Sequence, residues 1–170
     1  NDNKVLTDFL KTGIYDIERE FKKTISPSMD ILISSNLERF LFEITGHESS
    51  KINKWYQDLN QEKQFKIDQQ TLNKIQELFS GQCSTESEAR SVIKSTYHNF
   101  NYLLDPHTAV GVDSLNKYRQ QTGDQREAVV ASTANPYKFS RAVLESLKEE
   151  QIDKDEYKII EDLKDLTAVN

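Results

Sequence analysis

The chain has 170 residues, a formal net charge of −6, a pI near 5.2 and 29% charged residues, which suits one domain with a sizeable core and a polar surface. An acidic chain without clustered Lys and Arg excludes a nucleic-acid-binding surface, and no apolar run approaches the roughly 20 residues of a membrane span. The single cysteine, Cys83, cannot form an intrachain disulfide, which is typical of a protein of the reducing cytoplasm.

Residues 1–34 are expected to form a helix, a strand and a loop. The helix should end at Gly13, because glycine readily adopts the left-handed conformation of a C-terminal stop. Alternating residues over Ile14–Phe21 favour a strand with the mixed polarity of an edge or a surface. Thr24–Ser34 is expected to be extended chain or loop around Pro27. Four apolar residues share one face of the helix: Val5, Leu6, Phe9 and Leu10.

Residues 35–124 are expected to form a block of helices. One helix should begin at Ser35, because Ser35 and Glu38 form a capping-box pattern in which each side chain can satisfy a backbone donor of the other. Thr85 and Glu88 repeat this pattern. Apolar residues at helical spacing define the faces of four helices: Leu37, Phe40, Leu41 and Ile44; Ile52, Trp55, Tyr56 and Leu59; Leu72, Ile75, Leu78 and Phe79; Ala89, Val92, Ile93 and Thr96.

Proline at the first position of a helix marks two further helix starts. Asp105-Pro106 has the order of an N-cap residue and a first helical residue, since proline lacks only a donor that would be unpaired there. This helix should run to about Gln121, with Gly123 as its stop. Asn135-Pro136 repeats the same signal.

Residues 125–170 are expected to form a strand, a turn and a helix, followed by a C-terminal helix. Ala128–Ser132 is short, apolar and partly β-branched, which is typical of a buried parallel strand. The last helix should begin near Asp153. Two sets of apolar residues should face the core from these helices: Phe139, Val143, Leu144 and Leu147; Tyr157, Ile160 and Leu163.

The fold class expected from these elements is helix-rich α/β with two or three strands. A pair of strands on its own makes a poor sheet, and a piece of a larger α/β domain would show this deficit. Such a piece exposes sheet edges, so self-association of the chain is expected to be possible.

Three separated motifs, in this order and at this spacing, resemble the carboxy-terminal part of bacterial and fungal threonine synthase. They are Ser26-Pro-Ser-Met-Asp-Ile31 running into Ser34-Ser-Asn-Leu-Glu-Arg-Phe40, then Asp105-Pro-His-Thr-Ala-Val-Gly111, and finally Val129-Val-Ala-Ser-Thr-Ala-Asn-Pro-Tyr-Lys-Phe139. The resemblance runs from Asn1 to about Leu147. That family depends on pyridoxal 5′-phosphate (PLP) and has the tryptophan synthase β-like fold. The resemblance implies that residues 1–34 and 125–170 belong to a PLP domain and that residues 35–124 are a helical insertion.

The resemblance also implies a reaction, the conversion of O-phosphohomoserine and water to L-threonine and phosphate. The family's Schiff-base lysine motif and glycine-rich phosphate loop have no counterpart in this chain and would lie upstream of Asn1. Covalent PLP catalysis needs that lysine. The chain alone is therefore expected to be inactive and without PLP, and no catalytic residue is assigned in it.

The turn before Asn135-Pro136 is the expected cofactor contact. By the resemblance, a hydroxyl at this turn hydrogen-bonds the pyridine nitrogen of PLP; Thr133 is assigned this role, with Ser132 as the alternative. Without the resemblance, Ser and Thr at this place would be ordinary residues that cap a helix. Asn135 stands where the family usually has a histidine, so any role of an imidazole there is absent.

Substrate contacts are expected from two of the three motifs. Ser34, Ser35, Asn36 and Arg39 combine a helix N-terminus with an arginine, which suits the phosphate or carboxylate of the substrate. The alternative is a cap and an ordinary ion-pair residue. His107 and Thr108 are a second pair of candidates, against the alternative that they are structural donors at a helix start. No histidine or cysteine has metal-ligand spacing, so no metal site is expected.

A different class of function is the alternative: a non-catalytic helical module that binds a partner protein through the acidic region Glu48–Glu88. The intact motif Thr133–Phe139 argues against it, since such a module has no need of that turn. A threonine dehydratase of the same fold is a weaker match, because the first two motifs are not expected there.

Overall fold

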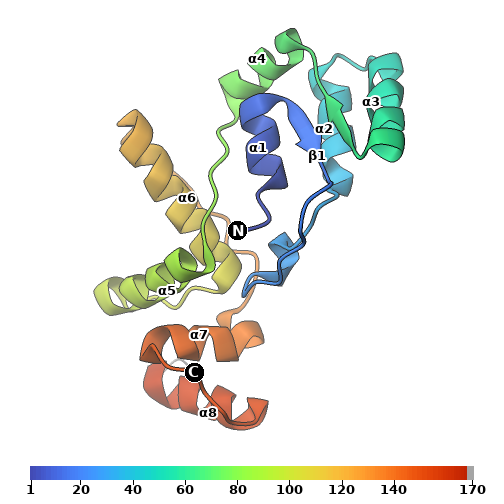
Figure 1. Cartoon of the computed structure of the whole chain (residues 1–170). Helices are drawn as coiled ribbons and strands as arrows, with labels where there is room; N and C mark the ends of the chain where they lie inside the picture. The colour runs from blue at the N-terminus through green and yellow to red at the C-terminus, as the bar shows by residue number, and fades with distance from the viewer. Residues whose placement is uncertain (168–170) are drawn as a thin grey trace. The chain divides into compact units, whose positions relative to one another are not determined.

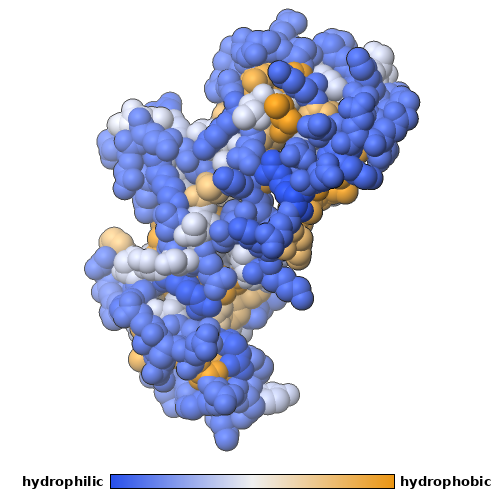
Figure 2. All heavy atoms as spheres, in the orientation of Figure 1, coloured by the Kyte–Doolittle hydropathy of each residue, from blue (hydrophilic) through white to orange (hydrophobic). Residues whose placement is uncertain are grey.

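The computed structural model describes residues 1–167, which form two compact units. The N-terminal unit comprises Asn3–Lys22 and Asp30–Gln82, and the C-terminal unit comprises Asn1–Asp2, Lys23–Met29 and the chain from Cys83 onward. The boundary after Gln82 divides the expected helical block 35–124 between the two units. On the face drawn in Figure 2, hydrophilic side chains cover most of the surface and apolar areas between them are small.

The N-terminal unit consists of four helices around a two-stranded antiparallel sheet. In β1, Tyr15 pairs with Phe65 of β2, so the sheet joins segments about fifty residues apart in sequence. Gly13, with φ of 73°, turns the chain from the first helix directly into β1. The elements, labelled in part in Figure 1, are α1 (Val5–Thr12), β1 (Ile14–Asp16), α2 (Ser35–Ile44), α3 (Ser49–Glu62), β2 (Gln64–Lys66) and α4 (Gln69–Leu78).

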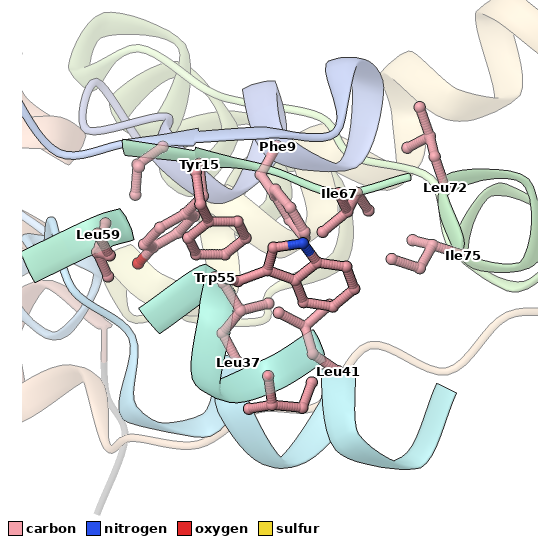
Figure 3. Close-up of a cluster of buried hydrophobic side chains, with 12 residues drawn as sticks. Phe9, Tyr15, Leu37, Leu41, Trp55, Leu59, Ile67, Leu72 and Ile75 are labelled. Carbon is pink, nitrogen blue, oxygen red and sulfur yellow. The ribbon is translucent and has the colours of Figure 1, made fainter. Parts of the chain in front are cut away.

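The core of the N-terminal unit is a cluster of aromatic rings between the sheet and the helices. The ring of Tyr15 is stacked on that of Phe65 with centroids 5.3 Å apart, and Phe9 meets both rings edge-on. Trp55 of α3 also stacks on Phe65. In Figure 3, Tyr15, Trp55 and Phe9 converge, with aliphatic side chains of α2 and α4 around them. Rings in offset and edge-to-face contact add to the stability that their burial gives.

The C-terminal unit is formed by helices and short 3-10 turns, and its described residues contain no strand. The helix α5 packs against both α6 and α7, and α7 packs against α8. Apolar residues of all four helices form the second core, among them Ile93, Ala109, Val143 and Ile159. The elements are η1 (Pro27–Met29), α5 (Glu86–Phe100), α6 (Pro106–Thr122), η2 (Pro136–Phe139), α7 (Ser140–Lys148) and α8 (Glu156–Thr167). Across both units, the described residues include no helix that is both long and apolar enough to cross a bilayer.

The expected starts and stops of several helices are confirmed. Thr85 and Glu88 form a complete capping box at the start of α5. Asp105 caps α6, with Pro106 as the first helical residue, and Gly123 ends that helix in the left-handed conformation. Each of these signals depends on atoms within four residues, so it can be recognised from the local sequence.

The parallel strand expected at Ala128–Ser132 is wrong. These residues form irregular chain, and the side chain of Val129 is 99% exposed. A strand needs a partner strand for its backbone donors and acceptors, and the part of the chain that the structure describes offers none here. The turn at Ser132 and Thr133 therefore leads from irregular chain, and not from a strand, into η2.

Two other expectations need correction. The helix α2 does begin at Ser35, but Ser34 is its N-cap residue and makes no side-chain cap bond, so Ser35 and Glu38 form no capping box. The last helix begins at Glu156 rather than near Asp153, because the carboxylate of Asp155 accepts the first backbone N–H groups. The face of α8 is shifted accordingly: Ile159 and Leu163 are buried, whereas Tyr157 is 83% exposed and Ile160 is exposed.

Candidate functional site

A fully buried carboxylate organises the start of α6. The side chain of Asp105 has no exposed surface. Its Oδ1 accepts hydrogen bonds from the backbone N–H and from Nδ1 of His107, both at 2.9 Å, and its Oδ2 accepts from the hydroxyl of Thr108. A buried charge is tolerated only when hydrogen-bond donors surround it. Asp105 is therefore the centre of a network as well as a helix cap.

The imidazole of His107 connects this network to the first motif. Its Nε2 accepts a hydrogen bond of 3.1 Å from the backbone N–H of Ser28 in η1. Because Nε2 is an acceptor, the ring proton must be on Nδ1, which donates to Asp105. The ring also contacts that of Phe139 in the third motif, with centroids 4.7 Å apart. Both ring nitrogens are thus bound within the C-terminal unit, which supports a structural role for His107.

The hydroxyl of Thr108 connects the network to the cofactor turn expected from the sequence. Thr108 Oγ1 lies 3.2 Å from Ser132 Oγ. Thr108 has only one hydroxyl proton, and the carboxylate of Asp105 is the stronger and nearer acceptor. The hydrogen bond between the two hydroxyls must then run from Ser132 to Thr108, so the proton of Ser132 is already in use.

A glycine allows the same turn to approach α6. A Cβ atom placed on Gly111 would lie 3.2 Å from Cγ1 of Val130, which is closer than an unstrained contact. Gly111 ends the second motif and Val130 belongs to the third. Residues of all three motifs, with Ser28 from the first, thus meet in the C-terminal unit around the first turns of α6.

The turn itself is exposed and is shaped by Asn135. Its side-chain Oδ1 accepts from the backbone N–H of Tyr137 at 2.9 Å, and its carbonyl oxygen accepts from the N–H of Lys138. Asn135 therefore caps η2, a task that its short amide side chain performs well. Thr133 is exposed, and none of the described residues forms a hydrogen bond with its hydroxyl.

The second group of expected site residues lies at the start of α2 in the N-terminal unit. The backbone N–H of Ser34 donates to the hydroxyl of Tyr15 at 2.9 Å, and this hydroxyl donates in turn to the carbonyl oxygen of Leu32. Burial raises the pKa of Tyr15, so the hydroxyl keeps its proton. Tyr15 thereby fixes the backbone where α2 begins. The only signal for this role in the sequence is an aromatic residue on one face of an expected strand.

The other three residues of this group are exposed: Ser35, Asn36 and Arg39. The guanidinium of Arg39 donates to Oδ1 of Asn36, and no carboxylate among residues 1–167 forms an ion pair with it. These residues belong to the N-terminal unit, whereas His107, Thr108 and Ser132 belong to the C-terminal unit. Each group of expected site residues therefore lies within one unit. No group of three His, Cys, Asp or Glu side chains within the described ranges is placed to hold a metal ion.

Comparison with known proteins places the chain in one family. The family model "Threonine synthase, C-terminal" matches residues 108–170. Threonine synthase-like 1 of Macaca fascicularis is 39% identical over 153 residues, which cover 89% of this chain and 20% of that protein. Threonine synthase of Saccharomyces cerevisiae is 33% identical over 161 residues, covering 86% of this chain and 31% of that protein.

Solved structures agree with the sequence matches. PLP-bound threonine synthase from Brucella melitensis superposes with a TM-score of 0.75 at 30% identity, covering 99% of this chain and 39% of that chain. Yeast threonine synthase superposes with a TM-score of 0.78 at 27% identity, covering 99% and 40%. These matches confirm the helix-rich α/β class and the tryptophan synthase β-like fold.

The chain spans from a fifth to two fifths of the length of these relatives. The resemblance carried by the three motifs is confirmed, and it extends over nearly the whole sequence. The chain therefore belongs to the threonine synthase family and corresponds to the carboxy-terminal part of its members.

Proposed function

We propose that this chain is the carboxy-terminal part of a PLP-dependent threonine synthase of the cytoplasm, which converts O-phosphohomoserine and water to L-threonine and phosphate. The observation that supports this most directly is that residues of all three family motifs meet around Asp105. The network that joins Ser28, His107 and Ser132 restrains the turn after Ser132. A restrained turn is what the binding of a ligand there requires. Relatives named threonine synthase contain counterparts of most of this chain.

The turn at Ser132 and Thr133 is proposed to contact the pyridine nitrogen of PLP. Since the proton of Ser132 is donated to Thr108, the exposed hydroxyl of Thr133 is the one that can still donate to an unprotonated ring nitrogen. When bound, PLP supplies an electron sink for carbanions, and the neutral partner at its ring nitrogen adjusts how strongly it withdraws electrons. Thr133 is proposed as the cofactor-binding residue, and Ser132 holds the turn.

The start of α2 is proposed to bind the anionic part of the substrate. The N-cap residue Ser34 makes no side-chain cap bond, so the first backbone N–H groups of α2 are available to an anion. Arg39, without a carboxylate partner among the described residues, adds a positive charge one turn away. Ser35 and Asn36 contribute further hydrogen-bond donors. His107 and Thr108 are proposed to act through the turn that they position and not by touching the substrate.

The catalytic lysine is proposed to come from a part of the protein that this chain does not include. No lysine here lies in a segment that resembles the family's Schiff-base motif. We therefore expect no turnover from the 170 residues alone, and PLP binding only in the complete protein.

The test is phosphate release from O-phosphohomoserine by the complete protein with PLP, in the wild type and in three variants. Thr133→Ala should lower kcat/KM about fivefold to tenfold, the loss expected for one neutral hydrogen bond. Thr133→Ser keeps the hydroxyl and should retain most of the activity. Ser132→Ala is the matched neighbour, and we expect a smaller loss from it. No phosphate release by the wild-type protein would reject the proposed reaction and favour the non-catalytic interaction module.

A further inference from the structure

A small hollow lies beside the start of α7 in the C-terminal unit, apart from the residues proposed above. Its volume is about 340 Å³. The lining comes from η2 and α7, from α5 and α8, and from the chain before η1: Ile25, Arg90, Lys138, Phe139, Ser140, Arg141, Ala142, Glu145 and Glu156. Neither Ser132 nor Thr133 contributes to it.

The first feature that indicates a ligand is a buried hydroxyl. Ser140 is the first residue of α7 and only 4% exposed, and it lines the hollow. No other described residue forms a hydrogen bond with its Oγ. The hydroxyl of Ser140 therefore has no partner among the described residues that would compete with a ligand in the hollow.

The second feature is the helix start itself. The 3-10 helix η2 runs directly into α7, and its last residue, Phe139, provides no side-chain cap for the first backbone N–H groups of α7. These groups carry partial positive charge that favours an anion. The helix has nine residues, and its start coincides with the buried hydroxyl of Ser140.

The third feature is the balance of charge around the hollow. Arg141 is bound to Glu156, and Arg90 is bound to Glu145, so the two carboxylates in the lining are already neutralised. Lys138 lines the same hollow, is exposed, and has no carboxylate partner among the described residues. It leaves the hollow with a net positive charge. A larger neighbouring hollow of about 710 Å³ has the opposite balance, with four glutamates against one arginine and one lysine.

We propose that this hollow is an oxyanion-binding site for a phosphate group, held by Lys138, the hydroxyl of Ser140 and the first backbone N–H groups of α7. A phosphate group has several strong acceptor oxygens, so it can accept from the ammonium, the hydroxyl and the helix start together. The ligand can be free phosphate or the phosphoryl group of a small metabolite, because the chemistry recognised is the same.

The test is a titration of the 170-residue chain with inorganic phosphate at constant ionic strength, followed by the NMR signals of the Ser140 and Arg141 amides. We expect saturable shifts of these signals in the wild type. Lys138→Met should weaken the affinity about fivefold, and Ser140→Ala by a similar factor. Lys148→Met is the matched control, since it removes an exposed lysine from the opposite end of α7, and it should leave the affinity unchanged.

Equal affinities of the Lys138→Met and Lys148→Met variants would overturn the site, as would the absence of saturable shifts in the wild type. A second titration with glycerol 3-phosphate identifies the source: tighter binding than that of inorganic phosphate would indicate a phosphorylated metabolite. If the isolated chain gives no dispersed amide signals, the same variants are compared in the complete protein by equilibrium dialysis with labelled phosphate. The result does not depend on turnover, so it is separate from the test of the proposed reaction.

Discussion

At the scale of single residues, Asp105 has the most consequences. Its buried carboxylate accepts from the backbone and the ring of His107 and from the hydroxyl of Thr108, and through them it reaches Ser28 and Ser132. A carboxylate with no exposed surface destabilises the fold unless hydrogen-bond donors surround it. The network therefore holds η1 and the cofactor turn at fixed positions relative to α6.

The change Asp105→Asn tests this role through stability. The amide has nearly the same shape but no charge, and one of its two oxygen acceptors becomes a donor. We expect the free energy of unfolding to fall by about 2 kcal/mol, the order expected for a hydrogen-bonded buried charge. Urea denaturation followed by circular dichroism measures it.

The control for that experiment is Asp162→Asn in the same unit. Asp162 pairs with Lys154 at the surface, where an ion pair contributes at most about 1 kcal/mol. An equal loss in the free energy of unfolding would show that the carboxylate of Asp105 contributes no more than one in a surface ion pair. That result would contradict the stabilising role of the network around Asp105.

The site could be predicted from the sequence only in part. The motifs that contain Thr133 and His107 were evident, and Asp105 was recognised as a helix cap. That the same carboxylate also orients His107 and Thr108 could not be predicted, because these contacts depend on how η1 and the chain around Ser132 return to α6. The role of Tyr15 at the start of α2 was missed for the same reason.

At the scale of elements, the start of α5 should respond to pH. A hydrogen bond from Lys117, and then that from the backbone of Thr85, lowers the pKa of Glu88 from 4.5 to about 2. A carboxyl whose pKa is lower in the folded state contributes stability above its unfolded pKa, and this contribution disappears as the pH falls through the folded value. We expect the contribution of Glu88 to be complete above about pH 4.5 and lost towards pH 2.

Two variants test that expectation. In Glu88→Gln the free energy of unfolding should vary less between pH 4.5 and 2 than in the wild type. Lys117→Met removes the largest cause of the shift and should flatten the same interval. Unfolding curves at several pH values provide the measurement, and an unchanged slope in both variants would be evidence against this ion pair.

The junction of α1 and β1 makes a second prediction at this scale. Gly13 has φ of 73°, and an added Cβ would lie 3.1 Å from Ile67 and 3.3 Å from Leu72. Gly13→Ala therefore combines backbone strain with a clash, and we expect a loss of about 2 kcal/mol or more in the free energy of unfolding. Gly46→Ala is the matched control in the same unit, because Gly46 has φ of 72° but nothing within 4 Å of an added Cβ. Equal losses would mean that packing at Gly13 has no effect.

Elements whose signals are local could be predicted, and those that depend on distant partners could not. The starts of α5 and α6 follow from Thr85 and Asp105 within a few residues. The strand β2 was not expected, because it exists only through pairing with β1. Ala128–Ser132 shows the reverse case: it has a sequence typical of a strand and no partner strand within the described chain.

At the scale of the whole molecule, the segment Ala128–Ser132 has apolar side chains that this chain leaves uncovered, as the exposure of Val129 shows. The relatives of this chain are two and a half to five times longer than the part that it represents, and we expect another part of the complete protein to cover this segment. Amide hydrogen exchange tests this: Val129 and Val130 should exchange rapidly in the 170-residue chain and slowly in the complete protein. Equally rapid exchange in both would leave the segment as a true loop.

The most direct test of the account is phosphate release from O-phosphohomoserine with added PLP, measured for this chain and for the complete protein side by side. We expect release by the complete protein and none by the chain, because the chain is proposed to contribute the cofactor turn and part of the substrate pocket but no catalytic lysine. Release by the 170 residues alone would contradict the assignment of catalysis to another part of the protein, and release by neither would contradict the proposed reaction.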